Sequence, residues 1–137
     1  MRTVILNKYS KEGNVEIKQI PTPTIGKNDV LVKIIFAGVN SLDNMIIREE
    51  VKFIVLYSLP LVMGNEFSGV IEKIGSDVTE FKIGDRVYGR MPLTKIGAFA
   101  EYTSIDKGEI ALIPNYLSFK EAACIPLTTL TSMQAFE

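Results

Sequence analysis

The sequence predicts a mainly β domain, a barrel-like body of short strands with a few small helices. Two features of the chain support this prediction. Short apolar, β-branched runs recur along it, and turns that contain glycine separate them, most clearly in residues 61–88. Its 137 residues are enough for one domain with a sizeable core and too few for two ordinary domains.

The N-terminal part of the chain contributes three expected strands. Residues 3–6 and 15–20 are short apolar segments separated by a polar turn. Pro21 and Pro23 then end regular structure, because proline has no N–H to donate to a neighbouring strand. Residues 30–39 form an apolar, β-branched run that is long enough for a buried strand.

A short helix is expected after this third strand. Ser41 is a candidate N-cap, and Asp43 falls in the first turn, where the helix dipole favours an acid. The helix would reach about Glu50. Residues 51–59 are ambiguous, because they are apolar enough for a strand but Pro60 ends the run.

The middle of the chain predicts most of the remaining strands. Residues 61–88 have the pattern strand, turn, strand, turn, strand, with glycine-containing turns at 75–77 and 84–85. A further strand is expected at 98–104, and a short one ends at Pro114.

Two short helices are expected at the C-terminal end. Ser118 and Glu121 form the capping-box pattern S-x-x-E at the start of the first. Pro126 interrupts it, and a second helix begins near Leu127. This second helix reaches Glu137 without a cap, a glycine or a polar tail, so we expect it to be cut rather than finished.

The composition is typical of a soluble globular protein. Apolar residues make up 47% of the chain, charged residues 23%, and the net charge is −1, which gives no electrostatic argument for nucleic acid or an anionic membrane. No apolar run approaches the roughly 18 residues of a membrane helix, and no signal-peptide pattern opens the chain, so a cytoplasmic protein is expected. The single cysteine, Cys124, cannot form an internal disulfide and is expected to be a buried, inert thiol.

The counts of histidine and cysteine bear on metal binding. Zinc sites use about three or four protein ligands, drawn mainly from Cys and His. The chain has no histidine and one cysteine, which is too few for either a structural or a catalytic zinc site. No spaced acidic loop suggests an oxygen-only calcium or magnesium site. We therefore expect no metal.

An ordered set of glycine-centred segments is the most specific feature of the chain. The segments are Ala37-Gly38-Val39-Asn40, Gly64-Asn65-Glu66-Phe67-Ser68-Gly69, Gly75, Gly84-Asp85-Arg86-Val87 and Gly97-Ala98-Phe99-Ala100-Glu101-Tyr102. This set resembles the GroES-like N-terminal domain of the medium-chain dehydrogenase/reductase superfamily, whose fold is a partly open β-barrel. Zinc-dependent members have a cysteine and a histidine where this chain has Asn40 and Asn65. The resemblance therefore implies the zinc-independent, quinone-oxidoreductase-like branch.

The resemblance also implies a division of the chain and a cofactor. Residues 1–122 correspond to the substrate-side domain, and residues 123–137 to the start of the helix that leads into a nucleotide-binding domain. The glycine-rich turn that holds a dinucleotide's pyrophosphate in such a domain opens no helix in this chain. NADP(H) is thus expected as the cofactor of a longer enzyme, and this chain alone is not expected to bind it tightly.

Three candidate site residues follow from the resemblance, and each has a plainer alternative. Asn40 would be a catalytic and cofactor-binding residue at the floor of the cleft beside the nicotinamide, or it merely ends a strand and helps Ser41 to cap the next helix. Asp43 would hold the cleft loop as a catalytic residue, or it is only a first-turn acid. Thr131 would face the cofactor, or it simply faces a neighbouring domain. Glu66 is expected to be a structural hydrogen-bonding residue.

Two functions remain open at this point. One is the substrate-side domain of a zinc-independent NAD(P)H-dependent oxidoreductase that reduces quinones, enones or similar small carbonyl compounds. The other is a non-enzymatic, truncated β-barrel that binds a partner or itself. In either case the apolar segment 122–137 is expected to self-associate, because an exposed apolar face tends to find a partner.

Overall fold

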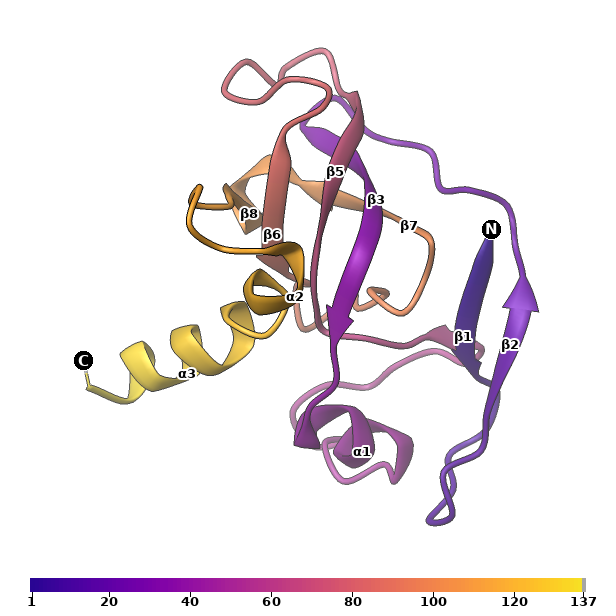
Figure 1. The fold of residues 1–137 in the computed structure, drawn as a ribbon. Coiled ribbons are helices and arrows are strands. Elements are labelled where there is room, and N and C mark those ends of the chain that lie inside the picture. The colour runs from indigo at the N-terminus through magenta and orange to yellow at the C-terminus, as the bar shows by residue number, and fades with distance from the viewer. Residues whose placement is uncertain (137) are drawn as a thin grey trace.

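The computed structural model describes residues 1–136 and confirms a mainly β fold (Figure 1). Its strands form two antiparallel sheets. The smaller sheet has the order β2-β1-β4, and the larger has the order β7-β3-β5-β6-β8. The strands are β1 Arg2–Leu6, β2 Val15–Gln19, β3 Asp29–Gly38, β4 Leu61–Val62, β5 Glu66–Ile74, β6 Arg86–Arg90, β7 Tyr102–Asp106 and β8 Ile110–Leu112. The helices are α1 Ser41–Ile47, α2 Phe119–Ala122 and α3 Pro126–Phe136, with a 3₁₀ turn at Lys107–Glu109.

The hydrophobic core lies between the sheets and against α1. Strand β3 pairs with β5 over most of its length, and both strands supply fully buried side chains. The largest buried side chains are Leu6, Ile46, Met63, Phe67, Ile71 and Ile105, with Val30, Val32 and Val87. Each fully buried aliphatic or aromatic side chain contributes about 1.5–3 kcal/mol relative to an exposed one, so this core is the main source of stability.

The predicted glycine turns are present, for two different physical reasons. Gly84 has φ of +92°, a conformation that side chains other than glycine rarely adopt. Gly75 has an ordinary conformation, but a Cβ there would collide with the backbone carbonyls of Gly26 and Lys27. The turn at Gly84 thus depends on the conformational freedom of glycine, and the turn at Gly75 depends on the close approach of two chain segments.

Segment 98–101 joins the two sheets and corrects one prediction. A single strand was expected at 98–104, but β7 begins only at Tyr102. On the smaller sheet, Phe99 O accepts from Val4 N at 2.8 Å and Glu101 N donates to Arg2 O at 3.1 Å. Glu101 O accepts from Ile34 N of β3 at 2.9 Å. The segment leaves the larger sheet because its hydrogen bonds are divided between the two, which gives the body its partly open barrel character.

The first helix differs from its prediction at both ends. Its N-cap is Asn40 and not Ser41, and it ends at Ile47, before the predicted Glu50. The ambiguous residues that follow form turns, not a strand. The cap shifts by one residue because the Asp43 carboxylate accepts a hydrogen bond from the Asn40 N–H at 2.9 Å.

The C-terminal helices follow the prediction more closely. Ser118 caps α2, its N–H donates to Glu121 Oε2 at 2.9 Å, and the Glu121 N–H donates back to Ser118 Oγ at 3.3 Å. Pro126 is the first residue of α3, which extends away from the sheets (Figure 1). Glu137, where the predicted helix reaches the chain's end, lies outside the described residues. Cys124 was expected to be buried, but its side chain is exposed because it lies in the turn between α2 and α3.

No helix within residues 1–136 is both long enough and apolar enough to cross a membrane.

Candidate functional site

A chain of buried polar side chains connects the end of β3, the first turn of α1 and the start of β5. Asn65 Nδ2 donates to Asp43 Oδ1 at 2.8 Å, and Asn40 N donates to Asp43 Oδ2 at 2.9 Å. Asn40 Nδ2 in turn donates to Glu66 Oε1 at 2.9 Å. The side chains of Asp43, Asn65 and Glu66 are 3%, 1% and 3% exposed. Buried polar groups need such partners, because an unpaired one costs about 1–3 kcal/mol.

Glu66 also holds the start of α3. Its Oε2 accepts from the Leu127 N–H at 2.8 Å, in the first turn of that helix, where the N–H groups have no partner within the helix. The space for the carboxylate depends on Gly38, where a Cβ would lie 2.5 Å from Glu66 Oε1 and 2.8 Å from Ala123 O. Glu66 therefore links Asn40 to α3 through its two oxygens, which agrees with the structural role expected for it.

Burial dominates the electrostatics of the two carboxyl groups. The pKa of Asp43 is raised by desolvation, against the lowering effect of its hydrogen bonds from Asn40 and Asn65. The pKa of Glu66 is raised first by desolvation and further by the charge of Asp43, while the Leu127 hydrogen bond and the charge of Arg90 lower it. Burial therefore disfavours ionisation of both groups, and the Asp43 carboxylate adds to this effect at Glu66.

Asn40 and Thr131 line one open cleft. They come from segments far apart in the chain: Asn40 is the N-cap of α1, and Thr131 lies in the middle of α3. The cleft has a volume of about 470 Å³. Its other lining residues are Leu42, Arg90, Leu127, Thr128 and Ser132. The structure therefore brings together the two residues predicted to face a cofactor.

Asp43 does not line this cleft. Its carboxylate lies behind Asn40, where it accepts hydrogen bonds from Asn40 and Asn65. In this position it supports Asn40, which lines the cleft. Direct participation of Asp43 in catalysis stays a prediction.

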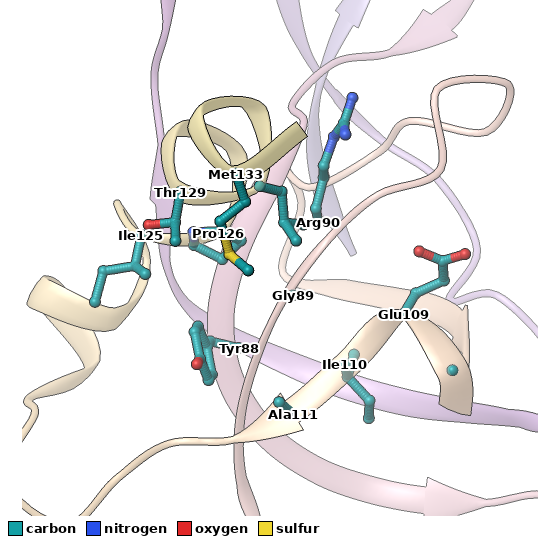
Figure 2. A pocket seen from close by; sticks show the side chains of 12 residues that line it. Tyr88, Gly89, Arg90, Glu109, Ile110, Ala111, Ile125, Pro126, Thr129 and Met133 are labelled. Atoms are coloured by element: carbon teal, nitrogen blue, oxygen red, sulfur yellow. The ribbon is translucent and has the colours of Figure 1, made fainter. Parts of the chain in front are cut away.

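A second, more apolar groove, which Arg90 also lines, lies between α3 and strands β6 and β8 (Figure 2). It has a volume of about 440 Å³. Its apolar walls include Tyr88, Ile110, Ala111, Ile125, Pro126 and Met133. Sequence reasoning missed both this groove and Arg90. A single arginine at a strand end forms no motif, and its place beside α3 depends on how distant segments pack.

Within the described residues, no three His, Cys, Asp or Glu side chains converge on a point where they could hold a metal ion. The side-chain amides of Asn40 and Asn65 donate hydrogen bonds to the carboxylates of Glu66 and Asp43. These are the positions at which zinc-dependent members of the superfamily that the sequence resembles have cysteine and histidine.

The sequence profile of the alcohol dehydrogenase GroES-like domain matches residues 26–115, which is most of the chain. The chain belongs to this family. The matched residues of the GroES-like domain include Asn40, Asp43, Asn65, Glu66 and Arg90, whereas Thr131 lies beyond them.

Individual relatives of this GroES-like domain are oxidoreductases by name. The chain is 35% identical over 139 residues to "NAD(P)H oxidoreductase RTN4IP1, mitochondrial" of Dictyostelium discoideum, covering 98% of this chain and 40% of that protein. It is 36% identical over 140 residues to the 2-methylene-furan-3-one reductase of Solanum lycopersicum, covering 94% of this chain and 36% of that one.

A solved structure supports the fold of the GroES-like domain. The quinone oxidoreductase of Escherichia coli, in complex with NADPH, superposes with a TM-score of 0.88 at 25% identity, over 100% of this chain and 40% of that one. The chain thus spans about 40% of the length of these relatives, and it represents their N-terminal, GroES-like portion.

Proposed function

We propose that this chain is the substrate-side domain of a zinc-independent, NAD(P)H-dependent oxidoreductase that reduces conjugated carbonyl compounds such as quinones and enones. One observation carries the proposal: Asn40 and Thr131 line the same open cleft in a domain of an oxidoreductase family. The names of the tomato and Escherichia coli relatives, a furanone reductase and a quinone oxidoreductase, suggest the substrate class.

The cleft fits a nicotinamide in its chemistry. An amide side chain both donates and accepts hydrogen bonds, and a threonine hydroxyl does the same, so both can meet a carboxamide group. When bound, the reduced nicotinamide supplies the hydride. Asn40 and Thr131 would hold the ring, and Glu66 would keep both in place by binding the Asn40 amide and the first turn of α3. We take NADP(H) as the cofactor because the Escherichia coli relative was solved with NADPH.

The proton that completes a reduction would come from water. The chain has no histidine, and the cleft lining contains no Asp or Glu among the residues that the structure describes. The carboxyl groups of Asp43 and Glu66 are buried and already accept hydrogen bonds. The role of the protein is then to position reactants and to exclude competing reactions, because orientation alone can account for roughly 7–11 kcal/mol of a barrier.

The test is NADPH oxidation by the full-length gene product with a quinone and with an enone as substrates. Asn40→Ala should lower kcat/KM by about 10²-fold, whereas Asn44→Ala, an exposed position on the same helix, should leave it unchanged. The 137-residue chain alone should show no enzymatic turnover. Absence of turnover with both substrate classes, or full activity of Asn40→Ala, would argue against the proposal.

A second candidate is a non-enzymatic, self-associating module. It is favoured by the apolar side chains that α3 exposes, among them Met133 at 57% and Phe136 at 93%. The coding sequence after residue 137 separates the two candidates. A glycine-rich βαβ segment there would support the enzyme, and a stop codon would support the module.

The location in the cell is also a proposal. The expected cytoplasmic location can be tested by microscopy of the full-length product with a C-terminal fluorescent tag. The Dictyostelium relative is mitochondrial by name, so a mitochondrial signal would replace the cytoplasmic assignment.

A further inference from the structure

Arg90 lies at the boundary of the two grooves beside α3. It is the last residue of β6, it is half-buried, and it lines both the Asn40–Thr131 cleft and the apolar groove. In Figure 2 its side chain leaves the strand and points away from Ile110 and Ala111, alongside α3. The guanidinium therefore turns away from the apolar strand β8.

This guanidinium has no partner among residues 1–136. No hydrogen bond or ion pair of its side chain is present there, and its nitrogen atoms reach solvent. Other arginines of the domain are engaged. Arg86, on the same strand, donates to Leu117 O at 2.8 Å and stacks over the Phe119 ring, and Arg2 pairs with Glu101 at 2.8 Å. Arginine keeps its charge at any physiological pH and carries five N–H donors.

The carboxylates near Arg90 do not pair with it. The charge of Arg90 lowers the pKa of Glu66, but the two Glu66 carboxylate oxygens already accept hydrogen bonds from Asn40 and Leu127. Neither oxygen lies within 4.0 Å of an Arg90 guanidinium nitrogen, so the two side chains form no ion pair. The remaining cleft lining in the described chain is apolar or neutral: Leu42 and Leu127, with the exposed residues Thr128, Thr131 and Ser132 on α3. The cleft thus has an unpaired positive charge beside hydroxyl groups and no acidic group in its wall.

We infer that Arg90 makes this cleft a binding site for an anionic oxygen group, a carboxylate or a phosphate, on its ligand. A planar guanidinium binds such groups through two parallel N–H···O bonds, which are stronger than neutral hydrogen bonds. The α3 hydroxyls can complete the coordination of the same oxygens. Two sources share this chemistry: a phosphate of the cofactor and a carboxylate of the substrate. Only the choice between these sources rests on the proposed function.

The test is a titration of the ¹⁵N-labelled 137-residue chain, followed by NMR at Arg90 Nε–H and the Thr131 amide. The probes are inorganic phosphate, crotonate and, as the uncharged counterpart of crotonate, crotonamide. We expect at least one anion to shift both resonances with a Kd of about 1–10 mM and crotonamide to shift neither. Tighter binding of phosphate would indicate the cofactor as the source, and tighter binding of crotonate would indicate the substrate.

Variants check that Arg90 is responsible. Arg90→Gln should weaken anion binding at Thr131 by at least ~10-fold. Arg48→Gln, which changes an exposed arginine at the C-cap of α1, should not change it. The inference is wrong if no anion shifts Arg90 Nε–H in the unaltered chain, if crotonamide shifts it as crotonate does, or if Arg90→Gln binds equally well. Because no cofactor or turnover is involved, this result is independent of the activity test.

Discussion

The two ends of α3 are held in opposite ways. Its first turn is anchored, because Pro126 and Leu127 are buried and the Leu127 N–H donates to the buried Glu66 carboxylate. Its later turns expose apolar side chains: Leu130 at 42%, Met133 at 57% and Phe136 at 93%. The same helix thus belongs to the site at one end, and at the other end no part of residues 1–136 covers its apolar side chains. Thr131 follows Leu130 directly, so its position depends on the anchored first turn.

The largest expected effect concerns the exposed end. Burying about 400 Å² of apolar surface on α3 contributes on the order of 10 kcal/mol before the costs of association. We therefore expect the chain to self-associate through residues 122–137, or that end of the helix to fray. Light scattering over a concentration series, with amide exchange of residues 127–136, measures both.

A matched pair of variants sharpens this test. Met133→Glu should abolish self-association, whereas Gln134→Glu adds the same charge at a polar position of the same helix and should not. A strict monomer at high concentration that also protects residues 127–136 from exchange would contradict the expectation.

The next largest effect concerns the anchored end. Glu66→Ala leaves the Leu127 N–H and the Asn40 amide without their acceptor, and each unpaired buried donor costs about 1–3 kcal/mol. We expect the free energy of unfolding to fall by about 2–6 kcal/mol, measured by urea denaturation. Glu72→Ala, on the same strand but in an exposed pair with Lys33, should change it by less than about 1 kcal/mol. Equal losses in the two variants would show that Glu66 is no anchor.

A smaller effect is the pH dependence of the anchor. The pKa of Glu66 is raised in the folded protein, mainly by burial, so the folded state binds more protons than the unfolded state between the two pKa values. Its contribution to stability is fully present below the unfolded pKa and is lost as pH rises through the folded pKa. The stability advantage of the unaltered chain over Glu66→Gln should therefore shrink as pH rises from 4 to 8 in urea denaturation. An advantage that grows with pH would mean that the carboxylate is stabilised as an anion.

The smallest effect is expected from metal removal. The chain has no histidine and one cysteine, so the folding of neither end of α3 should require bound zinc. EDTA should leave the Tm unchanged, and elemental analysis should find no stoichiometric zinc. About one zinc per chain, lost together with the fold on chelation, would overturn the zinc-independent assignment.

Local sequence was informative wherever the physical cause is local. The capping box of Ser118 and Glu121 acts across three residues, and the structure contains it. The β-branched run that became β3 and the left-handed turn at Gly84 also depend on preferences of neighbouring residues. Site geometry was less accessible. Asn40 Nδ2 donates to Glu66 and Glu66 accepts from the Leu127 N–H, and these partners are far apart in the chain.

The amino-acid sequence alone therefore determined the mainly β class, most strand and helix positions, and the absence of enough His and Cys for a zinc site. Only the tertiary structure decided that segment 98–101 divides its hydrogen bonds between two sheets, that Cys124 is exposed, and that Arg90 faces a cleft. Strand and turn preferences act over a few residues, so they can be predicted from the sequence. The cleft forms where α1, β6 and α3 meet, and their packing is set by burial of side chains from segments distant in the chain.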